Sequence, residues 1–486
     1  MIRRNFLVNL LLWILAFFFG YTIKKEGENL NLLKTDARMV LDKDGNNISE
    51  KIDVFSTQLA DKATKAQLEN ISVDVTDSRF GAKFDGVTND SSAIQTAIDY
   101  VSSMGGGTVR LPGGTTKANF TVKRAVSVVG AGKEVTIIKP YSTGAVITYG
   151  DGNSLMATLV LKDFTIYGNV NDPTNDGIYF PRGVGTVTKL SGFWECTFRD
   201  IFIQYCGRYG MNFSAGDNYQ TQQFSLFENI HIRYCKNNGI YAVGNVQNNI
   251  FIRVVCRKNG NHGMFLDNIL IESTHYNPND NTFLRCLFEN NENGGTCHGI
   301  KSKGQRNTYD SCWFERNGLQ DTAKNSAGFY NDYPSTSNTM NRIRDCSFRN
   351  NYYDIWFYKG NNNILDGNSI MNNDTIVIGK QFAIRIDSLS QNNIFGRQDF
   401  SLVGGAVAVT AATTYTATRN QPSGSTTMQA GATSVVQFIN EENPPRILVN
   451  ASWNTNAWTT NRSSSSFTIN VAVAPTVDSP VFWRLD

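Results

Sequence analysis

The chain has 486 residues, which is enough for two or three domains and a substantial core. Its formal net charge is only +3, so no broad basic surface for nucleic acid is indicated. Glycine is abundant, with 41 residues, while proline is scarce, with 11. This composition favours a turn-rich all-β body over a disordered chain.

The first apolar segment, residues 6–23, is just long enough to span a bilayer, and only Asn9, Gly20 and Thr22 interrupt it. Basic residues lie on both sides, so the charge rule favours a cytoplasmic N-terminus only weakly. Because no small-x-small cleavage site follows, we predict a signal-anchor or transmembrane helix in residues 1–25, with a cleaved signal peptide as the alternative. The body would then be extracellular, or carried on a virion.

Residues 26–72 are polar and predict a short helical stem. Ile48, Ile52, Phe55 and Leu59 are spaced by four, three and four residues, as in a heptad seam. Two heptads are too few for a stable coiled coil alone. The helix is therefore either the stem of an oligomer whose subunits associate through another part of the chain, or an amphipathic helix that packs against the rest of its own chain.

Residues 73–138 contain a strand, a glycine-rich turn and a helix, followed by further strands. Ser92 and Gln95 have the spacing of a capping box at the start of the helix, and the three glycines at 105–107 end it. The four motifs read Phe80-Gly-Ala-Lys-Phe-Asp-Gly-Val-Thr-Asn-Asp, Ala93-Ile-Gln-Thr-Ala-Ile, Gly106-Gly-Thr-Val-Arg-Leu-Pro-Gly-Gly and Val129-Gly-Ala-Gly.

This opening resembles that of the pectate-lyase-like superfamily, a group of right-handed parallel β-helix polysaccharide lyases, glycoside hydrolases and phage tailspikes. Two positions depart from the family pattern: Phe84 replaces the usual glycine, and Asn89 replaces the usual aspartate. The resemblance implies that the helix caps the N-terminal end of a β-helix. It does not define a reaction.

A repeat covers most of the remaining chain, and each copy begins with a glycine followed by an alternating strand. A period of 20–40 residues with short strands and Asn/Gly turns predicts a parallel β-helix over residues 73–395. The copies are Gly177-Ile-Tyr-Phe, Gly210-Met-Asn-Phe, Gly239-Ile-Tyr-Ala, Gly263-Met-Phe-Leu, Gly299-Ile-Lys-Ser, Gly328-Phe-Tyr-Asn and, without the glycine, Asp354-Ile-Trp-Phe.

Beyond the repeats, residues 396–486 carry alternating strands with polar turns, which predict a β-sandwich-like module. Its layout is similar to modules that close and trimerise phage appendage proteins. A homotrimer is therefore one assembly that the sequence allows. The predicted fold class is therefore all-β: a right-handed parallel β-helix with an N-terminal helical cap, a short helical stem and this module.

Eight cysteines recur at similar repeat positions, for example Cys286, Cys312 and Cys346. We predict a ladder of buried free thiols, with disulfides as the alternative. There is no CxxC pair, and the four histidines show no metal-ligand spacing, so neither a metal nor another cofactor is expected. His262 and His298 each precede a repeat glycine, which indicates a turn role.

Strand alternation assigns the residue two places into each copy to the outside. Five of the seven residues at this position are aromatic: Tyr179, Tyr241, Phe265, Tyr330 and Trp356. A flat ladder of rings about 5 Å apart suits sugar rings, a neighbouring subunit or a covering loop. We predict Tyr241, Phe265, Tyr330 and Trp356 as substrate-binding residues.

Asp267, Lys303 and Asp332 occupy one outward position in three consecutive copies. Carboxylates two coils apart would be separated by about 10 Å, near the upper end of the spacing in inverting glycosidases. We predict Asp267, Asp332 and Lys303 as catalytic residues, against the alternative of a surface ion-pair ladder. Glu289 and Glu315 form a second candidate pair.

Together these features predict a polysaccharide-binding surface protein that also degrades polysaccharide, as a glycosidase or a lyase. The competing hypothesis is a non-catalytic adhesin or a tailspike-like structural appendage that binds through the same ladder.

Overall fold

The computed structural model describes residues 71–150, 154–183, 190–334 and 339–372, two strands within residues 22–33, and the strands beyond residue 381 with some of their neighbours. The chain forms two compact units, Met1–Ile71 and Ser72–Asp486.

In the first unit, β1 (Thr22–Glu26) and β2 (Asn29–Leu33) form an antiparallel pair. This differs from the helical stem expected there, because the Asn-Leu-Asn-Leu pattern of β2 alternates with the period of a strand. The heptad residues and most of the apolar segment lie outside the described residues. Within the described part of the chain, no helix is long and apolar enough to cross a membrane.

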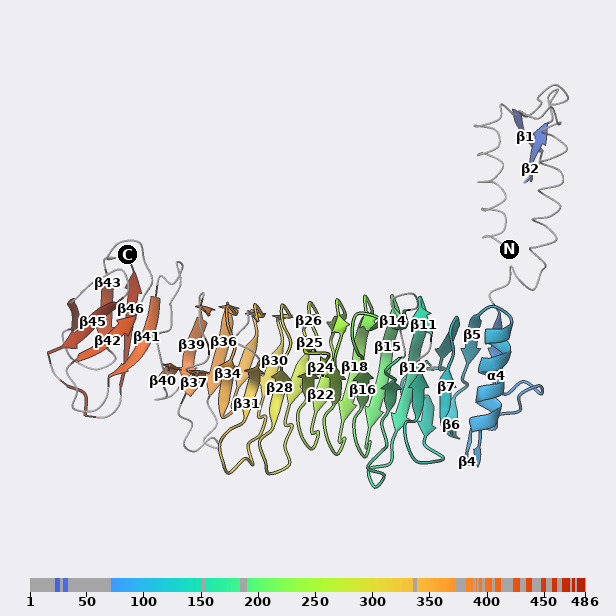
Figure 1. The fold of residues 1–486 in the computed structure, drawn as a ribbon, viewed down its shortest axis with the longest axis horizontal. Coiled ribbons are helices and arrows are strands. Elements are labelled where there is room, and N and C mark those ends of the chain that lie inside the picture. The colour runs from blue at the N-terminus through green and yellow to red at the C-terminus, as the bar shows by residue number, and fades with distance from the viewer. Residues whose placement is uncertain are drawn as a thin grey trace. The chain divides into compact units, whose positions relative to one another are not determined.

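The second unit contains a right-handed parallel β-helix, as the repeats predicted, in which strands of successive coils lie side by side (Figure 1). Its long sheet has eleven strands, all parallel. They are β7 (Phe120–Val122), β10 (Ile147–Tyr149), β13 (Ile178–Phe180), β16 (Met211–Ser214), β19 (Ile240–Val243), β23 (Met264–Asp267), β28 (His298–Ser302), β31 (Ala327–Asp332), β34 (Tyr353–Lys359), β37 (Phe382–Ile386) and β40 (Val407–Ala411).

A bent sheet forms the opposite wall as two columns that share β12 (Val160–Tyr167), β15 (Thr197–Gln204) and β18 (Leu226–Arg233). One column adds β3 (Ser72–Asp74), β5 (Gly107–Arg110), β8 (Val126–Val129), β21 (Ile250–Ile252), β26 (Thr282–Leu284), β29 (Thr308–Asp310), β32 (Arg342–Arg344), β35 (Ile364–Asp366) and β38 (Ile394–Phe395). The other adds β4 (Asp85–Asn89), β6 (Gly114–Lys117), β9 (Thr136–Lys139), β22 (Val255–Arg257), β27 (Leu287–Glu289), β30 (Trp313–Glu315), β33 (Ser347–Arg349), β36 (Asn368–Asn372) and β39 (Gln398–Val403).

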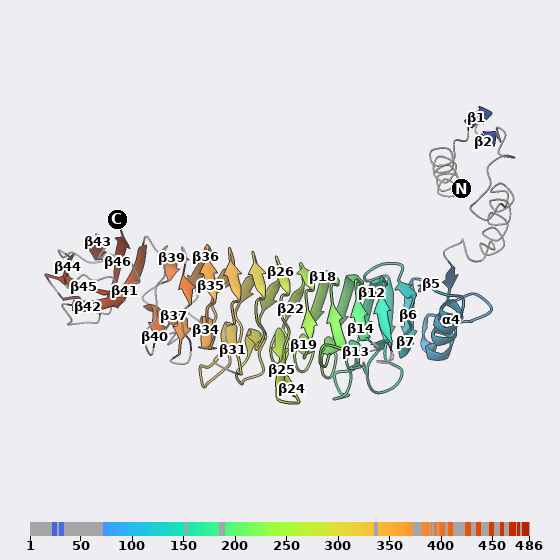
Figure 2. The ribbon, with the colours of Figure 1, turned by 45° about the horizontal axis from the view of Figure 1, so that its top comes forward.

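Two smaller groups of strands complete the β-helix. A four-stranded parallel sheet contains β11 (Leu155–Ala157), β14 (Ser191–Trp194), β17 (Gln220–Gln223) and β20 (Val246–Gln247). The hairpin of β24 (Ile269–Ile271) and β25 (Thr274–Tyr276) projects from the coils (Figure 2).

Helix α4 (Ser91–Ser103) packs on β5 and β7 at the N-terminal end and buries its apolar face. The predicted capping box does not form, since the N-cap is Asp90 and no side chain caps the helix. Gln95 instead accepts a hydrogen bond from the backbone N–H of Thr121, at 2.8 Å. Phe84 has a φ of 50°, which explains why glycine is usual at this position in the family.

The interior is held by stacks of identical or similar side chains. Phe198, Phe227, Phe251, Phe283 and Tyr309 stack from coil to coil with ring centroids 4.6–4.8 Å apart. All eight cysteines lie buried as free thiols, in agreement with the repeat positions they occupy. Coil stacking thus brings side chains of one repeat position into contact, which is why the sequence repeat is so regular.

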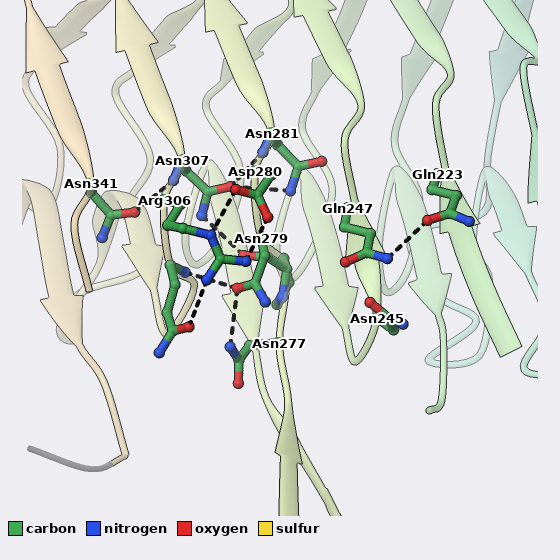
Figure 3. Close-up of polar contacts among 12 residues, drawn as sticks. Gln223, Asn245, Gln247, Asn277, Asn279, Asp280, Asn281, Arg306, Asn307 and Asn341 are labelled. Atoms are coloured by element: carbon green, nitrogen blue, oxygen red, sulfur yellow. Dashed lines mark hydrogen bonds and ion pairs between the residues drawn. The ribbon is translucent and has the colours of Figure 1, made fainter. Parts of the chain in front are cut away.

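Buried asparagines satisfy the backbone at the corners (Figure 3). The backbone N–H of Asn281 donates to Oδ1 of Asn307, at 2.9 Å, and that of Asn307 donates to Oδ1 of Asn341, at 3.0 Å. On the surface beside this ladder, Arg306 pairs with Asp280 at 2.6 Å. Each coil therefore supplies hydrogen-bond acceptors to the coil before it.

Beyond the β-helix, the chain forms two three-stranded antiparallel sheets. One contains β41 (Ser423–Met428), β46 (Ser479–Leu485) and β43 (Ile447–Ala451), and the other β42 (Ser434–Phe438), β45 (Ser466–Val471) and β44 (Ala457–Thr460).

Candidate functional site

The outer face of the long sheet brings the predicted binding residues into one column. The strand register aligns Tyr241 with Phe265, and then Lys301, Tyr330, Trp356 and Arg385 in turn. These residues belong to β19, β23, β28, β31, β34 and β37, and their neighbours in sequence point into the core. The sequence pattern thus correctly identified a shared outward position.

The rings do not form the flat ladder that the spacing predicted. Tyr241 and Phe265 are 5.6 Å apart with an interplanar angle of 62°, and Tyr330 and Trp356 are 4.8 Å apart with an angle of 67°. Lys301 interrupts the aromatic column and places its ammonium group over Phe265, at 4.8 Å. Alternation fixes which side a ring lies on, but not the rotation of the ring about its own bonds.

Asp267 lies at the centre of this surface and is held by three donors. Its carboxylate accepts hydrogen bonds from the Tyr241 hydroxyl, at 3.0 Å, and from the backbone N–H of Asn268, at 2.9 Å. It also forms an ion pair with Lys303, at 2.9 Å. The Asp267 side chain is only 17% exposed, and burial together with this carboxylate raises the pKa of Tyr241. The arrangement fixes an oriented carboxylate beside an aromatic ring.

Asp332 lies two strands away on β31, half-buried, after a bulge that separates it from Asn331. Lys301 on the intervening strand is close enough to both carboxylates that their charges raise its pKa, although burial and Lys303 lower it more. Two strand spacings correspond to about 10 Å. The structure therefore places the predicted catalytic residues on one surface, with a half-buried lysine between the carboxylates.

Trp356 is part of a more enclosed cluster. Its side chain packs with Ala327, Tyr352 and Tyr353, and the residue is only 7% exposed. Its indole N–H donates to Asp387, at 3.0 Å. Trp356 therefore offers less free ring surface than its outward position suggested.

Sequence reasoning missed Arg385 and Asp387, which complete this cluster. The guanidinium of Arg385 lies 4.2 Å from the centre of the Trp356 ring and donates to Asp387, at 2.8 Å. Both residues follow the last recognised repeat copy. The alternation of Ile384 and Ile386 around Arg385 is the signal that could have placed them in the next coil.

His262 and His298 stack at a corner beside this surface, with ring centroids 5.1 Å apart. The Nδ1 atom of His262 accepts the backbone N–H of His298, and the Nδ1 atom of His298 accepts that of Ala327, both at 3.0 Å. Burial lowers the pKa of His262 to about 3 and that of His298 well below its usual value. Both histidines thus act as neutral acceptors between coils. The turn role that their position before a glycine indicated does not hold for His298, because this residue opens strand β28.

Glu289 and Glu315 are neighbours on β27 and β30, but they belong to the bent sheet. Arg257 and Arg349 occupy the next positions in register on either side. This second candidate pair therefore lies between two arginines on the bent sheet, away from Asp267. Across the described ranges, no group of three or more His, Cys, Asp or Glu side chains is placed to hold a metal ion.

No protein-family model matches the chain. A curated relative, mannuronan C5-epimerase AlgE1 of Azotobacter vinelandii, is 39% identical over 106 residues, which cover 18% of this chain and 7% of the epimerase. Another, the capsule KN3-specific depolymerase 1 of Klebsiella phage KN3-1, is 26% identical over 298 residues, which cover 56% of this chain and 31% of the depolymerase. The chain thus spans less than a third of either relative.

Among solved structures, the tailspike protein gp49 of Acinetobacter baumannii bacteriophage Fri1, a capsular polysaccharide depolymerase, superimposes with a TM-score of 0.53. The match covers 86% of both chains at 12% sequence identity. At this identity the likeness supports the β-helix fold and not the reaction.

Proposed function

We propose that the protein is a tailspike-like surface protein that binds polysaccharide and degrades it as a glycosidase or a lyase. The observation that carries this proposal is the outer face of the long sheet, where Asp267 is fixed by Tyr241 and Lys303 beside Phe265. An oriented carboxylate, cationic side chains and aromatic rings on one surface suit a chain of sugar rings. The epimerase and depolymerase relatives act on polysaccharides according to their names, which supports the same substrate class.

Within this proposal, Asp267 and Asp332 are the acid and base. Their separation of about 10 Å leaves room for a sugar and a water molecule, near the upper end of the inverting range. Lys303 pairs with the Asp267 carboxylate and can also contact an acidic sugar. Tyr241, Phe265, Tyr330 and Trp356 would line the path of the polysaccharide.

A non-catalytic adhesin is the second candidate, and one observation favours it. Asp267 is already engaged by three donors, as expected of a carboxylate that only orders the surface. We expect a screen of bacterial capsular and cell-wall polysaccharides to detect product release, as new reducing ends for a hydrolase or as ultraviolet-absorbing unsaturated ends for a lyase. Binding of a polysaccharide without either product would favour the adhesin.

We further propose a virion-associated or extracellular location, with residues 1–25 as an anchor and a homotrimer as the assembly. The motivation for the anchor is the length of the apolar segment at residues 6–23. We expect the full-length chain to partition with membranes and a variant that begins at Ser72 to remain in the soluble fraction. An uncleaved full-length chain in the soluble fraction would contradict the anchor.

A further inference from the structure

Three tyrosines form a flat stack on a different edge of the β-helix. Tyr167 at the end of β12 stacks on Tyr205, with centroids 4.8 Å apart, and Tyr205 stacks on Tyr234, with centroids 5.1 Å apart. The interplanar angles are 30° and 13°. Tyr205 and Tyr234 directly follow β15 and β18, so the stack runs from coil to coil along the bent sheet. We call these three residues the tyrosine row.

Cationic side chains cover both ends of the tyrosine row. Lys139 lies 5.4 Å from the ring centre of Tyr167, and Arg233 and Lys258 lie 5.4 Å and 5.8 Å from that of Tyr234. The end faces of the stack are therefore occupied, while Tyr205 and Tyr234 remain partly exposed. Tyr167 is 38% exposed. In the described part of the chain, the structure records no hydrogen bond to any of these three hydroxyl groups.

The surface beside the row is positively charged. His231 lies on β18 next to it, and burial together with Lys133, Arg257 and Arg233 lowers the pKa of this histidine, while Glu134 opposes the effect. The whole chain has a formal net charge of only +3, so this gathering of cations is local. Unpaired hydroxyl donors beside lysine and arginine are the groups that bind carboxylates and other anionic substituents.

The backbone under the row turns with a positive φ, as it does at this corner in the later coils. Tyr205 and Tyr234 have φ values of 60° and 57°, a region that bulky residues rarely adopt. The same corner position in later coils holds Lys258, Asn290, Arg316 and Asn350, whose φ values lie between 51° and 54°. The positive φ thus belongs to the turn between coils, and what distinguishes Tyr205 and Tyr234 there is their stacked rings.

We propose that the tyrosine row is a second, non-catalytic binding site for an acidic polysaccharide, separate from the surface around Asp267. This inference rests on the proposed function for the nature of the partner. The row presents hydroxyl groups at intervals of one coil, with ammonium and guanidinium groups at its ends. A linear chain of acidic sugars can run along it and exchange hydrogen bonds with each coil. The two sites are close in sequence: residues 206–208 connect Tyr205 of the row to Tyr209, whose ring stacks on Tyr241 of the candidate site, with centroids 4.9 Å apart.

The test compares the double variant Tyr205→Asn, Tyr234→Asn with the control Phe224→Asn. Phe224 is also an aromatic residue at positive φ, with a φ of 55°, and is 51% exposed, but it belongs to another corner and contacts Trp194. All three substitutions relieve backbone strain, so thermal stability should stay equal or rise. We expect the double variant to bind alginate at least about tenfold more weakly, because it loses two hydroxyl donors, and the control to bind it as the wild type does.

Three probes define the ligand class: alginate as an acidic polysaccharide, dextran as a neutral one and polyglutamate as a polyanion without sugar rings. The inference requires the wild type to prefer alginate over both others, and this preference to weaken with added salt. Equal binding of alginate by the wild type and the double variant would overturn the proposal that the tyrosine row binds polysaccharide. It would not affect the function proposed for the surface around Asp267. Absence of alginate binding by the wild type would also overturn the proposed binding site at the tyrosine row. Product release from a neutral polysaccharide in the screen would then still support the proposed function.

Discussion

Replacement of Asp267 by asparagine should lower turnover of the cleaved polysaccharide at least about 100-fold while preserving its binding. Asparagine keeps the shape of the side chain and can still accept the hydrogen bond from Tyr241. It cannot exchange a proton at working pH, and it loses the charge that pairs with Lys303. Initial rates and binding constants of the purified variant, measured on the polysaccharide that the wild type cleaves, separate the two effects.

Asp310→Asn is the matched control. Asp310 is 18% exposed and pairs with Arg344 at 2.6 Å, so it resembles Asp267 in burial and pairing, but it lies on the bent sheet. This variant should retain full turnover. If Asp267→Asn and Asp332→Asn are both fully active, the catalytic assignment is wrong, and Glu289 and Glu315 become the next residues to replace.

Acidification should destabilise the β-helix through the two stacked histidines. An unfolded histidine has a pKa near 6.5, whereas burial lowers the pKa of His262 to about 3 and that of His298 well below its usual value. Below pH 6.5 the unfolded chain therefore binds more protons than the folded one, and stability falls as pH decreases. Each histidine contributes about 1.4 kcal/mol per pH unit, so the pair can remove up to about 4 kcal/mol between pH 7 and pH 5.

The loss of stability at low pH arises from protonation of the Nδ1 atoms of His262 and His298. Each accepts a backbone N–H from the next coil, and a proton at Nδ1 would replace an acceptor with a second donor. The variant His262→Asn, His298→Asn keeps an acceptor that does not titrate, as Asn238 already provides one coil earlier. Denaturant unfolding of this variant should show a shallower loss of stability between pH 7 and pH 5. The same pH dependence in variant and wild type would count against the histidines.

Much of the β-helix could be predicted from sequence because stacking imposes one residue type on one repeat position. The glycine copies, the cysteines and the outward column around Tyr241 all follow from that rule. The alternation of Met264 and Leu266 with Phe265 and Asp267 was sufficient to place the candidate site on one face.

The remaining features depend on contacts that the repeat does not encode. The orientation of the Trp356 ring depends on Tyr353, three residues earlier on the same strand, and on Arg385 in the next coil. The tyrosine row was missed because Tyr205 and Tyr234 lie at a corner, where the strand alternation ends. Their positive φ values can be recognised only once the chain is folded.

The corner asparagines also determine where the β-helix begins to unfold. In this ladder the backbone N–H of each asparagine donates to an asparagine side chain of the adjacent coil, from Asn281 to Asn307 and from Asn307 to Asn341. An internal coil can detach only if both of its neighbours release it, whereas a terminal coil is held on one side. Unravelling must therefore begin at an end, and the lifetime of the folded body under proteolysis or mechanical load is governed by what covers its first and last coils. At the first coil that cover is α4, which buries Ile94, Ala97, Ile98 and Val101 against the stack.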